Sequence, residues 1–249
     1  MRTDHALEIF LSGELGVPSA ENRSERREAA GLTVLHVDDA WNMKRRVADE
    51  FIVRTQPPAA VLPAVAAYHP VPDHLITLIG RPPTDHAAYL AAGYRHTATE
   101  ALMVRPLTDL PPRDPRYAVE RAATSTHLAW LNEHDPAGRA WLTATRLGEP
   151  RLRHSFITLD QRPVARVRVC RVDAGHGYVT HLYTAEAYRR RGLARAVMEQ
   201  ALHDAAAHGE QWSVLISSAA GLPLYQALGY QQRASLVVFE PDPARTTPA

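Results

Sequence analysis

Two stretches in the second half of the chain alternate apolar with polar residues, at residues 156–159 and 164–169. A period of two places successive side chains on opposite faces of a β-strand, so both stretches are predicted to be strands. Within the second stretch, Arg166 and Arg168 share one face. We expect that face to be exposed to solvent while the apolar face is buried; contact with an acidic ligand is the alternative.

A helical pattern follows further along the chain. Residues 193–208 carry apolar side chains on adjoining stripes with a helical period, and Gly209 stands where a helix end favours a left-handed residue. Apolar runs on either side predict strands, and a proline in a first turn is compatible with a short helix. These further elements are strands at 178–184 and 212–217, a short helix over 223–228 before Gly229, and sheet-covering helices within 126–147.

The order strand, glycine-terminated helix, strand occurs twice in the chain. Tyr225 lies 136 residues after Tyr89, and Gly229 lies the same distance after Gly93. A single long offset favours a duplicated domain over a solenoid, whose repeats are much shorter. Two unrelated units that share a glycine helix stop are the alternative. The matching runs are 75–79, 89–94 and 101–104 upstream, and 214–216, 225–230 and 236–239 downstream.

A proline-rich segment separates the two copies. Three prolines fall within residues 111–115, and proline disfavours both helix interiors and sheet ladders. We therefore predict an α/β (α+β) protein of two domains, each a mixed, mostly antiparallel sheet flanked by helices. The predicted boundaries are a first domain at 1–110, a linker at 111–116, a second domain at 117–240 and a frayed tail at 241–249.

The charged residues nearly balance, with 28 Lys plus Arg against 27 Asp plus Glu and a net charge of +1. This balance argues against a polybasic arm, so no nucleic-acid partner is predicted. No apolar run approaches the ~20 residues of a membrane span. The first ten residues carry charges where a signal peptide is apolar. We therefore expect a cytoplasmic protein without a membrane partner.

Two residue types that occur once exclude further classes of protein. Lys44 is the only lysine, and the sequence before it lacks the glycine-rich loop of a Walker-type phosphate site. Cys170 is the only cysteine, which excludes an intrachain disulfide. The thirteen histidines form no H-E-x-x-H pattern, so we predict no metal site.

An anion site is predicted where residues 188–194 (YRRRGLA) lead from a strand into a helix. The first amides of a helix have no partner within the helix and lie at the positive end of its dipole. Gly192 and Ala194 leave room for a close approach to the backbone, and arginines form charge-assisted bonds with phosphate. A pyrophosphate site is therefore predicted, and a solvated basic cap is the alternative.

Two motifs, taken together, resemble the GNAT superfamily of acetyl-CoA-dependent N-acetyltransferases. Residues 189–194 (RRRGLA) match its Q/R-x-x-G-x-G/A pyrophosphate loop, and residues 224–230 (LYQALGY) match its L-Y-x-x-L-G-F/Y element. The resemblance covers residues 150–240, with 117–150 as the family's variable opening segment. It implies acetyl transfer from acetyl-CoA to a primary amine of a small molecule, by direct transfer in a ternary complex. A protein or peptide acceptor, or a non-catalytic acyl-CoA-binding or sensory module, are the alternatives.

The resemblance also implies which residues form the site. Tyr225 matches the family's usual general acid, and packing of Tyr225 as a core residue is the alternative. His181 stands where many relatives carry a glutamate base, with Glu186 or a chain of waters as the other candidates. The expected acetyl-CoA contacts are Leu182, Tyr183, Thr184, Arg189, Arg190, Arg191, Gly192, Leu193, Ala194, Arg195 and Ser218.

The first copy departs from the family pattern. Residues 89–94 keep the last helix and its turn, yet no R-x-x-G-x-G/A pattern occurs before the linker. We therefore expect residues 1–110 to be a degenerate GNAT-like domain that binds no acetyl-CoA. Its expected role is to wall the acceptor cleft or to stabilise the pair, because ligand sites favour domain interfaces. The sequence gives no oligomeric state.

Overall fold

The computed structural model describes residues 1–17, 19, 21–41, 44–80, 85–134 and 142–246. Its first part contains α1 (Thr3–Leu15), β1 (Glu25–Ala29), β2 (Leu32–Trp41), β3 (Lys44–Val53), α2 (Pro58–Tyr68), β4 (His74–Ile79), α3 (His86–Ala91) and β5 (Tyr94–Pro106). Its second part begins with β6 (Val119–Arg121), α4 (Ser125–Glu133), α5 (Ala144–Gly148), β7 (Leu152–Leu159), β8 (Arg162–Arg171) and β9 (His176–Thr184). It ends with the 3-10 helix η2 (Glu186–Tyr188), α6 (Leu193–Ala207), β10 (Trp212–Ser218), α7 (Leu222–Ala227), β11 (Gln231–Pro241) and α8 (Pro243–Thr246).

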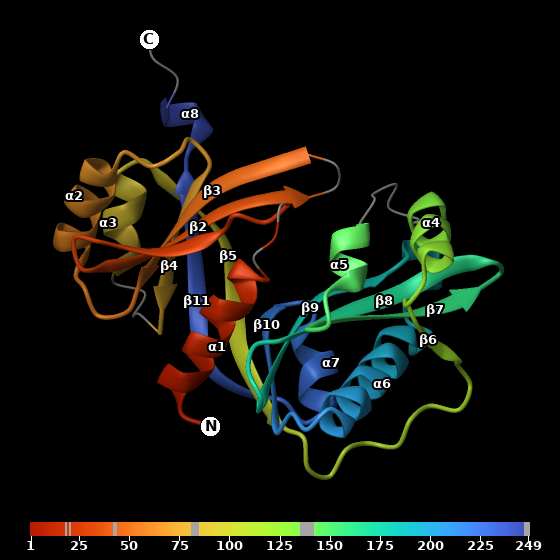
Figure 1. Cartoon of the computed structure of the whole chain (residues 1–249). Coiled ribbons are helices and arrows are strands. Elements are labelled where there is room, and N and C mark those ends of the chain that lie inside the picture. The colour runs from red at the N-terminus through yellow and green to blue at the C-terminus, as the bar shows by residue number, and fades with distance from the viewer. Residues whose placement is uncertain (18, 20, 42–43, 81–84, 135–141, 247–249) are drawn as a thin grey trace.

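The strands form one twisted sheet in the order β1-β2-β3-β4-β11-β5-β10-β9-β8-β7-β6 (Figure 1). Neighbouring strands are antiparallel except in two pairs of the described chain, β3 with β4 and β9 with β10. The predicted mixed, mostly antiparallel α/β fold is therefore confirmed. What the sequence did not predict is that both halves contribute to a single continuous sheet.

The two halves exchange their last strands. β5 belongs to the first half by sequence, yet it pairs with β10 of the second half. β11 belongs to the second half and pairs with β4 of the first. The two exchanged strands also pair with each other, antiparallel, at the centre of the sheet. Each half therefore completes the sheet of the other, and the segment between β5 and β6 is the covalent connection.

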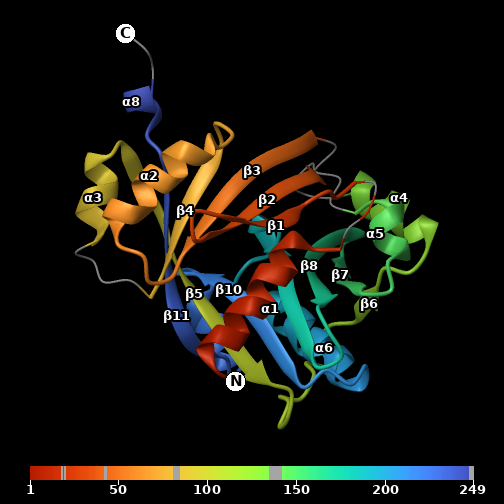
Figure 2. The ribbon, with the colours of Figure 1, turned by 60° about the vertical axis from the view of Figure 1, so that its left-hand side comes forward.

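Helices cover different parts of the two faces (Figures 1 and 2). The buried apolar side chains of α6 pack with those of β8 and β9 in one core, to which Tyr225 of α7 also belongs. The helices α2 and α3 cover β3, β4 and β11 in a second core. The third core lies under α1, which crosses β5 and β10 in Figure 2. None of the helices in the described part of the chain combines the length and apolarity needed to cross a bilayer.

α1 approaches the sheet closely because Gly13 has no side chain. A methyl group at Gly13 would lie 2.3 Å from Cγ of Tyr178 on β9, which is far inside van der Waals contact. The tip of α1 is thereby fixed beside the second half of the sheet. The hydrophobic pattern predicted neither this helix nor strands β1 to β3. At the other end of the chain, the segment predicted as a frayed tail includes the end of β11 and α8, while residues 247–249 lie outside the described part.

The expectation of a solvent-exposed arginine face on β8 is wrong. Arg166 and Arg168 are only 7% and 6% exposed, so both faces of this strand are buried. The alternation rule distinguishes the two faces of a strand but not what covers the second face. Here Arg168 lines a pocket together with residues of the first half and of α5.

Candidate active site

A gap opens between the parallel strands β9 and β10. Their pairing begins with Trp212 opposite His176 and ends with Leu215 opposite Val179. Beyond this point, residues 180–184 of β9 have no partner on β10. Backbone N–H and C=O groups at such an edge need a partner from elsewhere. The edge of β9 is therefore available to an extended ligand, and it contains the predicted contacts Leu182, Tyr183 and Thr184.

A β-bulge starts this divergence. One residue of β8, between Arg166 and Arg168, lies opposite two residues of β9, His181 and Leu182. His181 adopts φ of 59°, which is uncommon for a residue with a side chain. Such backbone strain occurs often at functional sites. The bulge turns β9 away from β10 at the position where the sequence predicted the site.

The predicted pyrophosphate loop lies at the start of α6. Gly192 is the N-cap with φ of 87°, and no side chain caps the helix. The Tyr117 hydroxyl donates a hydrogen bond to the Arg191 carbonyl oxygen at 2.6 Å, which holds the loop from outside. The positive φ of Gly192 favours glycine at this position, whereas a Cβ there would make only an ordinary contact with the Arg116 side chain, at 3.4 Å. The geometry is that of an anion site.

The arginines predicted to contact acetyl-CoA have different partners in the structure. Arg189 donates from Nε to the Thr184 carbonyl oxygen at 3.3 Å, which ties the loop to the end of β9. Arg191 stacks over Tyr188, with its guanidinium carbon 5.1 Å from the ring centroid. Arg195 is engaged elsewhere, because its Nε lies 2.7 Å from a carboxylate oxygen of Glu199.

Ser218 ends β10 at the rim of the gap, where its hydroxyl accepts a hydrogen bond from the Gly221 amide at 3.3 Å. Leu193 is buried in the core below α6, so its contribution to a ligand is limited to its backbone. Together with the loop, these positions surround the gap from the α6 and α7 side of the sheet. Arg190 is exposed and adopts φ of 65° within the loop.

Tyr225 lies on α7 and lines the same cleft as the gap. Burial raises the pKa of its phenol to about 12, so the group stays protonated at neutral pH. Among the residues that the structure describes, none forms a hydrogen bond with its hydroxyl. Tyr230 packs edge-on against it, with the ring centroids 5.7 Å apart. Tyr225 is thus a core residue that also lines the cleft.

His181 is a neutral ring in this structure. Burial, with Arg168 and Arg146 nearby, lowers the pKa of His181 well below its usual value. Arg168 can only donate, and its Nη1 lies 3.3 Å from Nε2 of His181. The proton is therefore assigned to Nδ1, which lies 2.7 Å from the Thr180 hydroxyl oxygen. Glu186, the other predicted base, is exposed in η2 and is not among the residues that line the cleft.

The cleft beside the gap has a volume of about 820 Å³. Residues from both halves line it, so it crosses the boundary that the sequence predicted between two domains. Three of its walls carry carboxylates, Glu14 on α1, Glu50 on β3 and Glu100 on β5. Burial and the charge of Glu14 raise the pKa of Glu100. No sequence motif marked these three glutamates, because their proximity depends on how the halves assemble.

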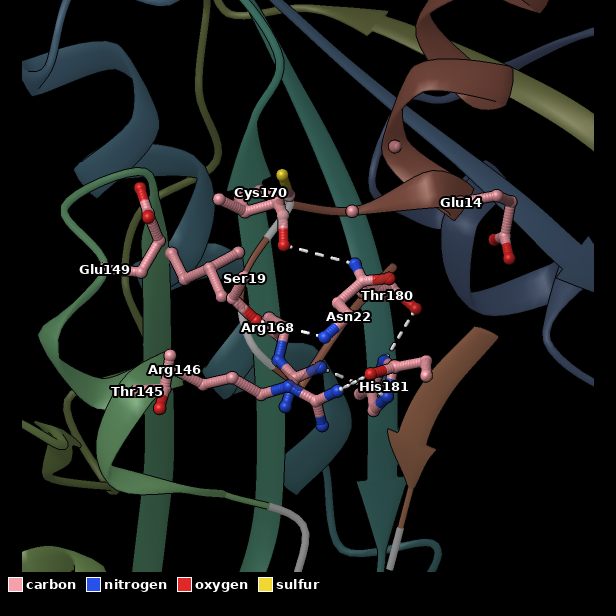
Figure 3. A pocket seen from close by; sticks show the side chains of 15 residues that line it. Glu14, Ser19, Asn22, Thr145, Arg146, Glu149, Arg168, Cys170, Thr180 and His181 are labelled. Atoms are coloured by element: carbon pink, nitrogen blue, oxygen red, sulfur yellow. Dashed lines mark hydrogen bonds and ion pairs between the residues drawn. The ribbon is translucent and has the colours of Figure 1, made fainter. Parts of the chain in front are cut away.

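A second pocket adjoins this cleft, since both are lined by Glu14, Asp39, Thr180 and His181. Figure 3 shows the guanidinium groups of Arg146 and Arg168 side by side in it. Arg146 forms an ion pair with Asp39. Burial and the neighbouring charge of Arg146 lower the pKa of Arg168 to about 9. Sequence reasoning missed Arg146 and Asp39, which come from α5 and β2.

Comparison with known proteins identifies the family. A model of the GNAT acetyltransferase family matches residues 107–230, which include the loop at α6, the gap and Tyr225. The chain belongs to the GNAT family, through residues 107–230. Members of this family use acyl-CoA donors, so the predicted family and the acyltransferase class are confirmed. No curated protein matches the chain.

Solved structures resemble the GNAT chain over nearly its whole length. A GCN5-related N-acetyltransferase from Kribbella flavida is 19% identical, with a TM-score of 0.63, over 96% of this chain and 95% of that chain. A conserved protein of unknown function from Staphylococcus epidermidis is 9% identical, with a TM-score of 0.62, over 87% and 93%. A tandem GNAT protein from the clavulanic acid biosynthesis pathway is 13% identical, with a TM-score of 0.50, over 96% of each chain. At these identities the likeness shows the fold alone.

Proposed function

We propose that the protein is an N-acetyltransferase that transfers the acetyl group of acetyl-CoA to a primary amine of a small molecule, directly in a ternary complex. One observation carries this proposal. The gap between β9 and β10 opens onto a cleft that is lined both by Tyr225 and by residues of the first half, and that is large enough for a small acceptor. The reacting groups of donor and acceptor could therefore meet beside Tyr225.

Residues around the gap fit an acetyl-CoA donor. The buried hydroxyl oxygen of Thr184 has no hydrogen-bond partner among the described residues, at the strand edge that would accept an extended pantetheine arm. Residues 189–194 would hold the pyrophosphate through the first amides of α6 and the arginine side chains. Bound acetyl-CoA supplies an activated acetyl thioester with a thiol leaving group. The same residues then place the acetyl group at the bulge beside His181.

Proton transfers complete the proposed reaction. The acceptor amine must lose one proton, its nitrogen forms a bond to the acetyl carbon, the carbon–sulfur bond breaks, and the sulfur receives a proton. Tyr225 is the proposed acid for the last of these steps, because its phenol is protonated and the residue lines the cleft. His181 remains the predicted base; to act as one, it requires Arg168 to release Nε2. Glu100, whose pKa is raised, is a second candidate in the cleft.

We also propose that the first half binds no acetyl-CoA. The equivalent parallel strands β3 and β4 stay paired up to Val53, the last residue of β3, so no gap opens between them. The helix α2, which corresponds to α6, begins with Pro57 as its N-cap and Pro58 after it. Proline has no N–H, so this helix end offers fewer donors to a phosphate. The absence of a gap and the prolines at the start of α2 agree with the absence of the R-x-x-G-x-G/A motif from the first half.

Turnover measurements test the proposed reaction. Purified protein with acetyl-CoA and a panel of primary amines should release free thiol, with the N-acetyl product seen by mass spectrometry. Product formed only from peptides would show that the acceptor is a peptide and not a small molecule. Donor binding without thiol release from any amine or peptide would show a binding module instead of an enzyme.

Calorimetry tests the proposal that the first half binds no acetyl-CoA. Titration with acetyl-CoA should give one site per chain. A stoichiometry of two would contradict the proposal that residues 1–110 hold no donor. Gly192→Ala should weaken binding at this single site, which would assign the site to the second half.

A further inference from the structure

The connection between the two halves lies along α6. Its contacts with the helix occur in reverse order along the chain: the Pro111 carbonyl oxygen lies 2.9 Å from Nε2 of His203, and the Asp114 amide donates to a carboxylate oxygen of Glu199 at 3.1 Å. The connection therefore runs antiparallel to α6 and reaches the start of the helix at residues 116–117. This is the helix end that carries the predicted pyrophosphate loop.

Tyr117 is the residue through which the connection holds this loop. Its ring is partly buried against the core below α6, as is Leu110 from the same connection. Its hydroxyl donates to the Arg191 carbonyl oxygen at 2.6 Å. Packing fixes the ring and the contacts with α6 fix the backbone, so the hydroxyl is a donor with a set position. The loop is bonded to it through a main-chain carbonyl group.

This hydrogen bond determines the direction of the next amide. In a trans peptide the C=O of one residue and the N–H of the following residue point in opposite directions. The peptide between Arg191 and Gly192 is trans, because the described chain contains no cis peptide bond. The Gly192 N–H therefore points away from Tyr117. Among the residues that the structure describes, none accepts a hydrogen bond from this amide.

The loop needs such an outside contact because its backbone turns easily. Gly192 adopts φ of 87°, and glycine populates positive and negative φ about equally. The peptide that precedes Gly192 can therefore rotate at little cost, which would turn its N–H to another side. A donor on the Arg191 carbonyl oxygen selects one orientation. Tyr117 supplies that donor from a segment outside the loop motif.

We propose that Tyr117 is a positioning residue of the donor site: by holding the Arg191 carbonyl group, it aims the Gly192 N–H at the diphosphate of acetyl-CoA. This amide then acts together with the unpaired amides of the first turn of α6, which favour the same negative charge. The assignment rests on the proposed acetyl-CoA site and adds to it a residue that the loop motif does not contain. It makes the connection between the halves part of the donor site.

Removal of one hydroxyl group tests the proposal by calorimetry with coenzyme A. Tyr117→Phe keeps the packed ring and loses the bond to Arg191. We expect the dissociation constant of coenzyme A to rise roughly fivefold, the effect of one hydrogen bond. In turnover, KM for acetyl-CoA should rise while kcat stays the same, because the hydroxyl does not touch the reacting atoms. An unchanged dissociation constant would overturn the proposal.

The matched control is a tyrosine of the first half. Tyr94 is half-buried at the start of β5, and its hydroxyl oxygen lies 3.0 Å from Nε2 of His74. Tyr94→Phe removes a hydrogen-bonded hydroxyl without touching the loop, so it should bind coenzyme A as tightly as the wild type. A loss of affinity equal to that in Tyr117→Phe would show a general loss of stability and would overturn the role of Tyr117.

Nuclear magnetic resonance of glycine amides reports on the Gly192 N–H itself. The chain has 13 glycines, so labelling of glycine with nitrogen-15 gives few signals, and Gly192→Ala identifies the signal that disappears. On saturation with coenzyme A, the Gly192 amide proton should shift downfield, because it gains a charge-assisted hydrogen bond. The shift should be smaller in Tyr117→Phe. No shift in the wild type, or the same shift in both proteins, would overturn the proposal.

The outcomes separate this assignment from the proposed function. A wild-type protein that does not bind coenzyme A would contradict the acetyl-CoA site and, with it, the role of Tyr117. Binding of coenzyme A that is equally tight in Tyr117→Phe would contradict the role of Tyr117 alone. Both measurements use binding, so an absence of turnover would contradict the transferase and still leave the role of Tyr117 decided by the affinity and the amide shift.

Discussion

Tyr225 is buried in the core and is also the proposed general acid. Its ring contributes to the core with Tyr230, and the residue also lines the cleft. Burial raises the pKa of the phenol to about 12, and a thiolate that leaves in the same apolar surroundings also becomes more basic. The two shifts offset each other, so the phenol can still share its proton with the leaving sulfur.

Tyr225→Phe should therefore lower kcat by roughly 100-fold, in the range expected for loss of a general acid. The donor dissociation constant, measured by calorimetry, should change little, because the ring remains. Tyr230→Phe is the matched control: it removes a buried hydroxyl that is hydrogen-bonded to Ser213 at 2.6 Å, away from the cleft. We expect the control to lose stability and keep kcat. Full turnover in Tyr225→Phe would remove the acid role.

The lowered pKa of His181 leads to a prediction for the pH dependence of kcat. A base works when it is deprotonated, and the pKa of His181 is lowered well below 6.5 by burial and by Arg168. If His181 is the base, kcat at saturating substrates should stay constant as pH falls from 7 past 6.5 and decline only at lower pH. In His181→Ala this acidic limb should disappear together with most of the activity. An unchanged pH profile in the variant would assign the base elsewhere.

His154 provides the control for that profile. It is also buried, its pKa is also lowered well below the usual value by burial and by Arg168, and Arg168 donates to its Nδ1 at 3.3 Å. It lines neither the cleft nor the second pocket. His154→Asn should therefore leave the acidic limb of kcat in place. Loss of the acidic limb in both His181→Ala and His154→Asn would indicate that the substitutions disturb Arg168, and not that a general base has been removed.

At the scale of single elements, the start of α6 is the part most open to test. Gly192 adopts φ of 87° at the N-cap, and Gly209 adopts φ of 85° after the last turn of the same helix. Substitution of either by alanine strains the backbone by roughly 1–2 kcal/mol. Only the first lies at the proposed pyrophosphate loop. We expect Gly192→Ala to weaken acetyl-CoA binding at least about tenfold, and Gly209→Ala to leave it unchanged; equal effects would contradict the loop assignment.

Elements with a strong local pattern were predictable from the sequence. The 15-residue helix α6 and strands β8, β9 and β10 appear where the apolar periodicity placed them. The motif residues 189–194 and Tyr225 were found because a short local sequence carries them. The error on Arg166 and Arg168 has the opposite origin. Both side chains are buried, and the pocket beside Arg168 is lined in part by residues of the first half, which lie more than a hundred residues earlier in the chain. Local pattern cannot report on such a contact.

At the scale of the whole molecule, the exchange of β5 and β11 couples the two halves. Removing either half would take away the strand that completes the other half of the sheet. We therefore expect a single unfolding transition in denaturant. Far-UV circular dichroism, which reports on both halves, should coincide with tryptophan fluorescence, which reports mainly on the second half because three of the four tryptophans lie there. Two separated transitions would show that the halves fold independently.

The exchange also determines what a break in the connection between the halves would do. The segment from 107 to 118 contains no helix or strand, and the pairing of β5 with β10 and of β11 with β4 does not depend on its continuity. A nick there would leave two polypeptides that are interlocked through the middle of the sheet, like a heterodimer produced by splitting one gene. Neither fragment would persist by itself, so the protein is suited to conversion into a split reporter whose activity returns only when both pieces are made together.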